Sequence, residues 1–336
     1  MRMLFAVVPL LALLLFACDD DDGGPRTLTI VVHDSFDASE ELIAAFEEEH
    51  NATVEIIAGG DANEIVNRAI LNAGNPEGDL LFGVDNLSYR RALEAGVFEE
   101  YEAERREDIP ADVLAVFDGE AWVTPIDFGF VTLNMDPAAG DPPQSLEELT
   151  EPAWDGALVV EDPATSSPGL QFLAQTVVNF GEGGWQDFWR ALRENDVLVA
   201  GGWTDAYYTQ FSFYDGQRPL VVSYTSSPAA EAFFGELAEP PTVNVNLGQL
   251  VRQVEAAGVL EGADEPELAR EFVDFMLSDE FQSQIPETMF VYPVMPGVAT
   301  PEWWRWAEVN FQFSDLSPEP EEVERWVAEW TAIMRR

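Results

Sequence analysis

Short apolar runs alternate with amphipathic segments through the N-terminal part of the chain. The runs at 28–32, 53–57 and 79–84 are rich in aliphatic and β-branched residues, and they predict strands. Apolar positions recur at helical spacing between these runs, from 42 to 49 and from 61 to 70, and predict helices. The strand–helix–strand order indicates an α/β fold with a parallel sheet.

Acidic residues follow each of these three predicted strands. Asp34 comes shortly after the first strand, Asp61 after the second and Asp85 after the third. Ligands of open α/β sheets bind where loops leave the carboxyl ends of the strands, so we expect these carboxylates to lie on one rim. His33 precedes Asp34 on the same rim, where it either ends the strand or contacts a ligand.

The second half of the chain repeats the α/β pattern. An apolar passage at 122–130 predicts a crossing into a second lobe, and further strands are expected at 158–160, 197–200, 220–223 and 243–245. An amphipathic helix at 268–282 is expected to return to the first lobe. We therefore assign 28–126, with a returning segment at about 265–300, to lobe 1 and 127–264 to lobe 2. A C-terminal helix within 301–336 is expected to pack across both lobes.

The N-terminus is typical of a secreted lipoprotein. One basic residue, Arg2, is followed by an apolar run at 4–17 and then by Cys18, so 1–18 is predicted to be a signal peptide. Residues 15–18 resemble a lipobox, which favours lipidation of Cys18 over an ordinary signal peptide with an incidental cysteine. Residues 19–27 are acidic and are expected to form a flexible tether. The mature protein is therefore expected outside the cytoplasm, anchored to a membrane.

Charge and cysteine content exclude several classes of function. The chain carries 63 acidic against 16 basic residues, a formal charge of −47, which disfavours nucleic acid and anionic lipid headgroups as partners. Most of these charges are expected on solvated helix faces, yet a cation entering an acidic cleft would gain electrostatically. Cys18 is the only cysteine, so the folded domain has neither a disulfide nor a thiol nucleophile.

Several short strings match one protein family in order and spacing. They lie at 34–36, 83–86, 125–130, 142–146, 162–170, 202–207, 223–228 and 292–294. Over nearly the whole mature chain the sequence resembles the thiamine-binding periplasmic proteins. The resemblance implies a type II periplasmic-binding-protein fold, with two α/β lobes joined by crossing strands and the ligand in the cleft between them.

The resemblance also implies a function and a set of contacts. The chain is expected to be the solute-binding component of an ABC importer that captures thiamine or its mono- or diphosphate. The expected partners are a permease with its ATPase and the membrane, and the protein is expected to be a monomer. Ala62 stands where the family often has glycine, which leaves only a main-chain contact there. The contacts carried over by position are Asp61, Ala62, Ser166, Ser167, Trp203, Tyr224, Thr225, Ser226 and Ser227.

The chemistry of the residues agrees with a flat cationic ligand. Aromatic faces attract a desolvated cation by about 0.5 to 2 kcal/mol each, so aromatic side chains near the matched strings are candidates for a cage. Each of them could instead pack in the protein core. For Phe290 and Tyr292, ligand contact and core packing are equally favoured. The candidates are Trp203, Tyr207, Tyr224, Phe290 and Tyr292.

Two hydroxyl-rich turns and four carboxylates complete the candidate site. The turns at 165–169 and 225–228 each open a predicted helix, where a phosphate or hydroxyl oxygen is well received, although a plain helix cap explains them equally. Asp61, Asp34 and Asp85 are candidate acceptors for the ligand's cation or amino group, or caps of turns. Asp127 is equally a hinge residue or a ligand contact.

Catalysis is not expected. The chain lacks a cysteine nucleophile in the folded domain, a zinc-binding His-Glu-x-x-His string, a Gly-x-Ser-x-Gly elbow and a phosphate-binding loop. No catalytic residue, cofactor or metal is therefore predicted. A ferric-ion carrier of the same superfamily remains the alternative, because Tyr207 and Tyr208 offer adjacent phenols, and a thiamine-processing enzyme on the same fold is a weaker one.

Overall fold

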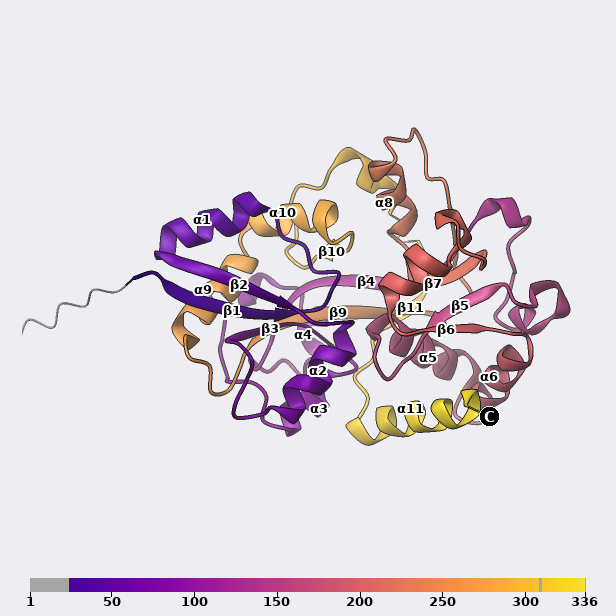
Figure 1. Cartoon of the computed structure of the whole chain (residues 1–336), viewed down its shortest axis with the longest axis horizontal. Coiled ribbons are helices and arrows are strands. Elements are labelled where there is room, and N and C mark those ends of the chain that lie inside the picture. The colour runs from indigo at the N-terminus through magenta and orange to yellow at the C-terminus, as the bar shows by residue number, and fades with distance from the viewer. Residues whose placement is uncertain (1–23, 308–309, 336) are drawn as a thin grey trace, which may run out of the picture.

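One mixed sheet runs through both halves of the molecule (Figure 1). The computed structural model describes residues 24–307 and 310–335. The strand order is β2-β1-β3-β9-β4-β7-β5-β6, and β8, β10 and β11 pair with β4 or β9. Strands β1, β2 and β3 are parallel, as are β5, β6 and β7, whereas β9 and β4 run antiparallel to their neighbours in the main order. The expected two-lobed α/β fold is confirmed.

The first lobe is built from the predicted strands and helices. Ser39 and Asp61 occupy the N-cap positions of α1 and α2, and their side chains accept backbone N–H groups there. Buried aliphatic and aromatic residues from the strands and helices form one large core on this side of the molecule. Its elements are β1 (Arg26–Val32), α1 (Glu40–His50), β2 (Ala52–Ala58), α2 (Ala62–Leu71), β3 (Leu80–Asp85), α3 (Tyr89–Glu94) and α4 (Ala111–Ala115).

The second lobe has its own core. The apolar faces of two helices pack on the sheet, and Trp185 and Trp189 are among the largest fully buried side chains. Its elements are β5 (Leu158–Glu161), α5 (Ser167–Phe180), α6 (Trp185–Glu194), β6 (Leu198–Ala200), α7 (Trp203–Asp205), β7 (Leu220–Tyr224), α8 (Ser227–Phe234) and β8 (Val243–Val245).

Two long strands connect the lobes. They are β4 (Thr124–Met135) and β9 (Leu250–Val259), and they pair with each other from Thr124 to Val131. One end of β9 pairs with β3 of the first lobe, and the far end of β4 pairs with β7 of the second. The lobe boundary expected at 126/127 therefore lies inside a continuous strand.

The C-terminal part of the chain contributes helices to both lobes. Helices α9 (Pro266–Met276) and α10 (Asp279–Thr288) join the first core, whereas α11 (Pro320–Met334) packs on α6 and contributes to the second. The start of α11 also reaches the first lobe, where Glu319 pairs with Arg90. Two short strands complete the sheet, β10 (Tyr292–Pro293) and β11 (Phe313–Ser314).

Two sequence predictions need correction. The single helix expected at 268–282 is two helices, because the Ser278 side chain accepts the N–H of Phe281 and starts a new helix. The tether expected at 19–27 ends earlier, since Arg26 and Thr27 already pair with β2. The predicted signal peptide and Cys18 lie outside the described residues. No helix in the described part of the chain is long and apolar enough to cross a membrane.

Short helical turns fill the connections between these elements. They are η1 (Arg106–Asp108), η2 (Pro137–Ala139), η3 (Glu147–Thr150), η4 (Pro152–Trp154), the π-helical η5 (Ala206–Gln210), η6 (Ser212–Tyr214) and η7 (Glu302–Trp306).

Candidate functional site

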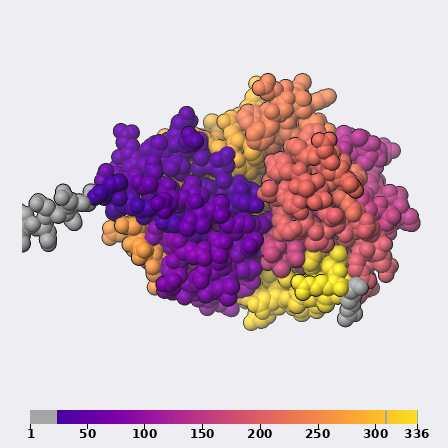
Figure 2. Space-filling view, viewed as in Figure 1, coloured from indigo at the N-terminus to yellow at the C-terminus, as the bar shows by residue number. Residues whose placement is uncertain are grey.

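A cavity of about 260 Å³ lies between the two lobes, beside the crossing strands. The first lobe contributes the loop after β1, the start of α2, the end of α10 and two side chains of β9. The second lobe contributes the start of α5, the segment from α7 to η6, the end of β7 and one face of α8. In the space-filling view the N-terminal segments, in indigo, face those around residue 220, in salmon (Figure 2).

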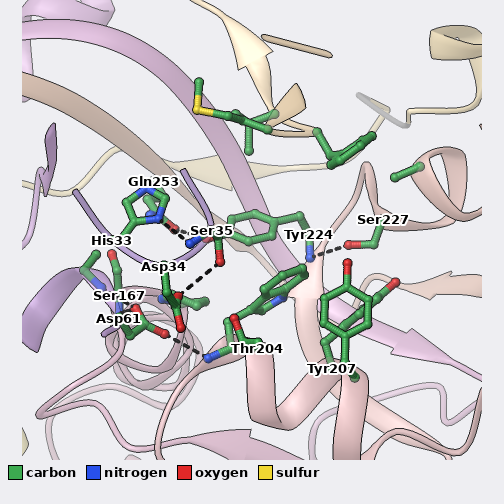
Figure 3. Close-up of a pocket in the computed structure, with 18 of the residues that line it drawn as sticks. His33, Asp34, Ser35, Asp61, Ser167, Thr204, Tyr207, Tyr224, Ser227 and Gln253 are labelled. Carbon is green, nitrogen blue, oxygen red and sulfur yellow. Dashed lines mark hydrogen bonds between the residues drawn. The ribbon is translucent and has the colours of Figure 1, made fainter. Parts of the chain in front are cut away.

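Asp61 joins the two lobes at the edge of this cavity (Figure 3). Its Oδ2 accepts the backbone N–H of Trp203 at 2.8 Å, and its Oδ1 accepts those of Ser167 at 3.2 Å and Ala62 at 2.6 Å. Trp203 and Ser167 belong to the second lobe, whereas Asp61 begins α2 of the first. Burial raises the pKa of Asp61, and the three N–H donors oppose that rise. The carboxylate therefore acts as a clasp across the cleft.

Aromatic rings form the second-lobe wall. The indole of Trp203 stacks on the ring of Tyr207, with centroids 4.9 Å apart and planes 19° apart. Tyr208 meets Trp203 edge-on at 5.5 Å, and Tyr214 lies 5.0 Å from Tyr208. The Trp203 Nε1 group donates to Ser223 Oγ at 2.8 Å, which fixes the ring. Tyr207 and Tyr208 lie in the π-helical turn η5, a distortion that is frequent at functional sites.

Glu231 is a buried carboxylate behind this wall. It is 4% exposed and projects from α8 towards the cavity. The hydroxyl of Tyr207 donates to its Oε1, and the hydroxyl of Thr242 donates to its Oε2. Burial raises the pKa of Glu231 to about 7, although both hydroxyl donors lower it. The group is thus balanced between its charged and neutral forms near neutral pH.

A pair of acids lies on the crossing strands at the floor of the cleft. Asp127 and Glu255 occupy paired positions of β4 and β9, and Glu255 also lines the cavity. Burial raises the pKa of each to about 8. His33 Nε2 lies 3.6 Å from Glu255 Oε1, and nearby the Tyr224 hydroxyl donates to Gln253 Oε1 at 2.8 Å. The floor is therefore acidic and buried.

The structure brings many of the sequence-predicted site residues together. Asp61, Trp203 and Tyr207 come from different lobes or elements, yet they line one cavity, as does Ser167. The predicted residues that line it are Asp34, Asp61, Ala62, Ser167, Trp203, Tyr207, Tyr224, Ser227 and Phe290.

The hydroxyl turns act as helix caps and loop anchors. Ser166 is the N-cap of α5, and its Oγ accepts the N–H of Gly169. The Ser226 hydroxyl donates to the carbonyl of Phe290, and Thr225 is fully buried. None of Ser166, Thr225 and Ser226 is among the residues that line the cavity. At the start of α5 the place of an anion is taken by Asp61, which accepts the Ser167 N–H.

Two further predicted residues lie outside the cavity lining for clear reasons. Asp85 is fully buried because α5 of the other lobe covers it, and its carboxylate accepts Ser167 Oγ and, at 2.9 Å, Gln171 Nε2. Asp85 therefore belongs to the interface between the lobes rather than to an open rim. Tyr292 stacks on Phe128 at 5.3 Å in a small separate apolar cluster with Trp304.

Several lining residues escaped the sequence analysis. Gln253 and Glu255 alternate along β9, a strand that the sequence analysis did not predict. Glu231 lies four residues after Ser227 on α8, so the two side chains lie on the same face of the helix. This spacing could have identified Glu231 from the sequence. Tyr214 also lines the cavity, 5.6 Å from the predicted Tyr207. Tyr208 lines it too, although the sequence had indicated Tyr208 only as a phenol for the ferric alternative.

The electrostatic character of the cavity is consistently acidic. Asp34, Asp61, Glu231 and Glu255 all line it, whereas no arginine among residues 24–307 and 310–335 does. An organic cation is the ligand type that such a lining favours, because aromatic faces and carboxylates both attract it.

Residues 41–311 match the family of bacterial extracellular solute-binding proteins. The chain belongs to this family. It is 30% identical over 335 residues to the thiamine-binding periplasmic protein of Escherichia coli, covering 96% of this chain and 98% of that one. A solved structure titled periplasmic thiamin binding protein superposes with a TM-score of 0.79 at 28% identity, over 93% of this solute-binding protein and 97% of the other chain.

A more distant relative bears a different name. Iron uptake protein A1 of Synechocystis sp. is 26% identical over 297 residues, which cover 83% of this chain and 79% of that protein. The named relatives are thus a thiamine-binding protein and an iron uptake protein, so more than one kind of solute occurs among them.

Proposed function

We propose that this solute-binding protein captures thiamine or a thiamine phosphate outside the cytoplasm and delivers it to an ABC permease. The observation that carries the proposal is a cavity that combines an aromatic wall at Trp203 and Tyr207 with four carboxylates and, in the part of the chain that the structure describes, no arginine. Thiamine presents two flat rings, one of them a permanent thiazolium cation, and both features suit these surfaces. Similarity over nearly the full length of the Escherichia coli thiamine-binding protein supports the same ligand.

Delivery rests on closure of the two lobes around the ligand. Asp61 of the first lobe already accepts two N–H groups of the second, so the closed form has contacts of its own. A ligand that touches both walls adds to them and shifts the equilibrium further towards closure. In this proposal the permease recognises the closed monomer, and lipidated Cys18 keeps the protein near the membrane. The protein performs no catalytic step.

A ferric carrier is the second candidate, because an iron uptake protein is among the relatives. Ferric sites use phenolate oxygens. Burial raises the pKa of Tyr207, and the negative charge of Glu231 raises it further. The pKa of Tyr208 is raised by the same two causes, and these shifts disfavour the phenolate form that a ferric ion needs.

Calorimetry of the purified protein distinguishes the two ligands. The protein is titrated with thiamine, thiamine monophosphate, thiamine diphosphate and ferric citrate. We expect a dissociation constant of about 1 μM or lower for at least one thiamine compound, which corresponds to roughly −8 kcal/mol. Tight binding of iron without any response to the thiamine compounds would overturn the proposal. Radiolabelled palmitate incorporation, lost in Cys18→Ala, tests the lipid anchor separately.

A further inference from the structure

Glu231 is a buried carboxylate whose hydrogen-bond donors are neutral. Tyr207 and Thr242 each donate one hydroxyl to it, one to each carboxylate oxygen. Within the described ranges, 24–307 and 310–335, no arginine or histidine forms an ion pair with Glu231. A buried carboxylate without a countercharge is unfavourable unless another positive group approaches it.

The groups that face Glu231 supply no positive charge. Tyr208 and Tyr214 lie on the adjoining turns and feel its negative charge, which raises their pKa values beyond the rise that burial causes. The negative charge of Asp136, which directly follows β4, also raises the pKa of Glu231. Its titratable surroundings are therefore three tyrosines and one carboxylate.

The negative charges of the other cavity carboxylates are stabilised by hydrogen-bond donors, by a nearby histidine or by exposure to solvent. Asp61 accepts three backbone N–H groups, two of them from the opposite lobe. Glu255 Oε1 lies 3.6 Å from His33 Nε2, and Glu255 is paired with Asp127 on the neighbouring strand. Asp34 is exposed at the mouth of the cavity, where water solvates it. Among the described residues, Glu231 is the one buried carboxylate lining the cavity for which neither an ion pair nor a backbone N–H donor is found.

We propose that Glu231 is the charge-selecting residue of this site, supplying the counter-ion that makes the cavity prefer a cationic ring over a neutral ring of the same shape. The inference rests on the proposed function, since thiamine supplies the cationic ring. Glu231 is buried, and the Tyr207 ring that donates to it packs against Trp203, Tyr208 and Tyr214. This burial strengthens the attraction of the carboxylate for a cation and its aversion to a neutral ligand.

Binding of the cation is then linked to loss of a proton. The pKa of about 7 means that part of the free protein carries a protonated Glu231 at neutral pH. A cation binds only after that proton leaves, so its apparent affinity falls by up to about tenfold for each pH unit below that pKa. A neutral ring has no such requirement, so its affinity does not fall as the pH drops below that pKa.

The test compares thiamine with an uncharged analogue in which carbon replaces the thiazolium nitrogen. Both are titrated by calorimetry into the wild type, Glu231→Gln and Glu231→Asp at about pH 7.5 and about pH 5.5. Glutamine has the same size and keeps hydrogen-bonding partners for Tyr207 and Thr242, while removing the charge. Glu239→Gln, an exposed position shortly after the same helix, is the matched control for net charge.

We expect Glu231→Gln to bind thiamine about tenfold or more weakly and the neutral analogue equally well or better. The wild type should lose thiamine affinity between the two pH values, and this loss should shrink in Glu231→Gln. Glu231→Asp keeps the charge, so it should still prefer thiamine to the analogue even if both bind less tightly. Glu239→Gln should match the wild type.

The outcomes separate this inference from the proposed function. If the wild type binds no thiamine compound, the proposed function fails. If the wild type binds thiamine and Glu231→Gln shows the same ratio of thiamine to analogue affinity, the proposed function stands and the role of Glu231 is refuted. Should Glu231→Gln not fold, the ratio measured for Glu231→Asp and the pH dependence of the wild type decide.

Discussion

Replacing Asp61 by alanine should loosen the closed form of the protein. The substitution removes two hydrogen bonds that cross the cleft, to the N–H groups of Trp203 at 2.8 Å and Ser167 at 3.2 Å. Hydrogen bonds to charged groups contribute about 1.5 to 3 kcal/mol each. Burial opposes the charge of Asp61 and raises its pKa, so part of this stabilisation is already offset. We expect a net loss of about 1.5 to 3 kcal/mol from the closed form.

This loss should appear as weaker ligand binding. A change of about 1.4 kcal/mol is tenfold in an equilibrium constant, so the dissociation constant of thiamine should rise by roughly ten- to a hundred-and-fifty-fold. Calorimetry gives the constant, and small-angle X-ray scattering with saturating thiamine reports whether the radius of gyration stays at the closed value. Asp61 is also the N-cap of α2, so thermal unfolding should show a separate loss of about 1 kcal/mol in stability.

Glu64→Ala is the matched control. Glu64 is an exposed acid on the same helix, and its contact with the second lobe is a backbone hydrogen bond to Thr165 that survives the substitution. It should leave both the affinity and the scattering curve unchanged. If Asp61→Ala binds thiamine as tightly as Glu64→Ala and scatters as the closed wild type, Asp61 is not the clasp.

Two further changes test the aromatic wall and the acidic floor. Trp203→Ala should weaken thiamine binding by about 1 to 3 kcal/mol in calorimetry while leaving the melting temperature nearly unchanged; equal affinity would remove the indole from the site. Asp127 has a pKa of about 8 in the folded protein against an ordinary value of 3.8, so the folded state holds a proton that the unfolded state releases as pH rises. Stability is therefore lost between about pH 4 and pH 8, and Asp127→Asn should reduce that loss in urea unfolding by up to about 1.4 kcal/mol per pH unit. Parallel curves for the two proteins would show that Asp127 holds no such proton.

Local patterns predicted the parts of the site that lie next to strong sequence signals. Asp61 follows an apolar strand and begins an amphipathic helix, so its place at the carboxyl end of the sheet follows from chain order. Trp203 follows Gly201 and Gly202, and it lies in a string that matches the thiamine-binding family, so it was predicted to contact the ligand. Both line the cavity in the structure.

The remaining predictions depended on contacts between distant segments. Asp85 ends its strand as predicted, but α5 of the other lobe packs over it. The residues around Asp85 in the sequence give no sign of this contact. Tyr292 is similar, because its stacking partner Phe128 lies on a neighbouring strand far away in sequence. Strand β9 was not predicted because Arg252, Gln253 and Glu255 interrupt its apolar pattern, although all three are buried.

The distribution of arginine explains why these buried acids matter for function. Arginines such as Arg90, Arg105 and Arg325 pair with acids near the surface, and none lines the cavity. Closure therefore places Asp61, Glu231 and Glu255 around one cavity, where His33, beside Glu255, is the only basic side chain among the described residues of the lining. Burial is the main cause of the raised pKa of each. For Asp61 and Glu231 no arginine or histidine among the described residues forms an ion pair that would oppose it, which leaves a charge imbalance. Under the proposed function, a cationic ligand would remove it, so capture of the ligand and stabilisation of the closed form would be one electrostatic event.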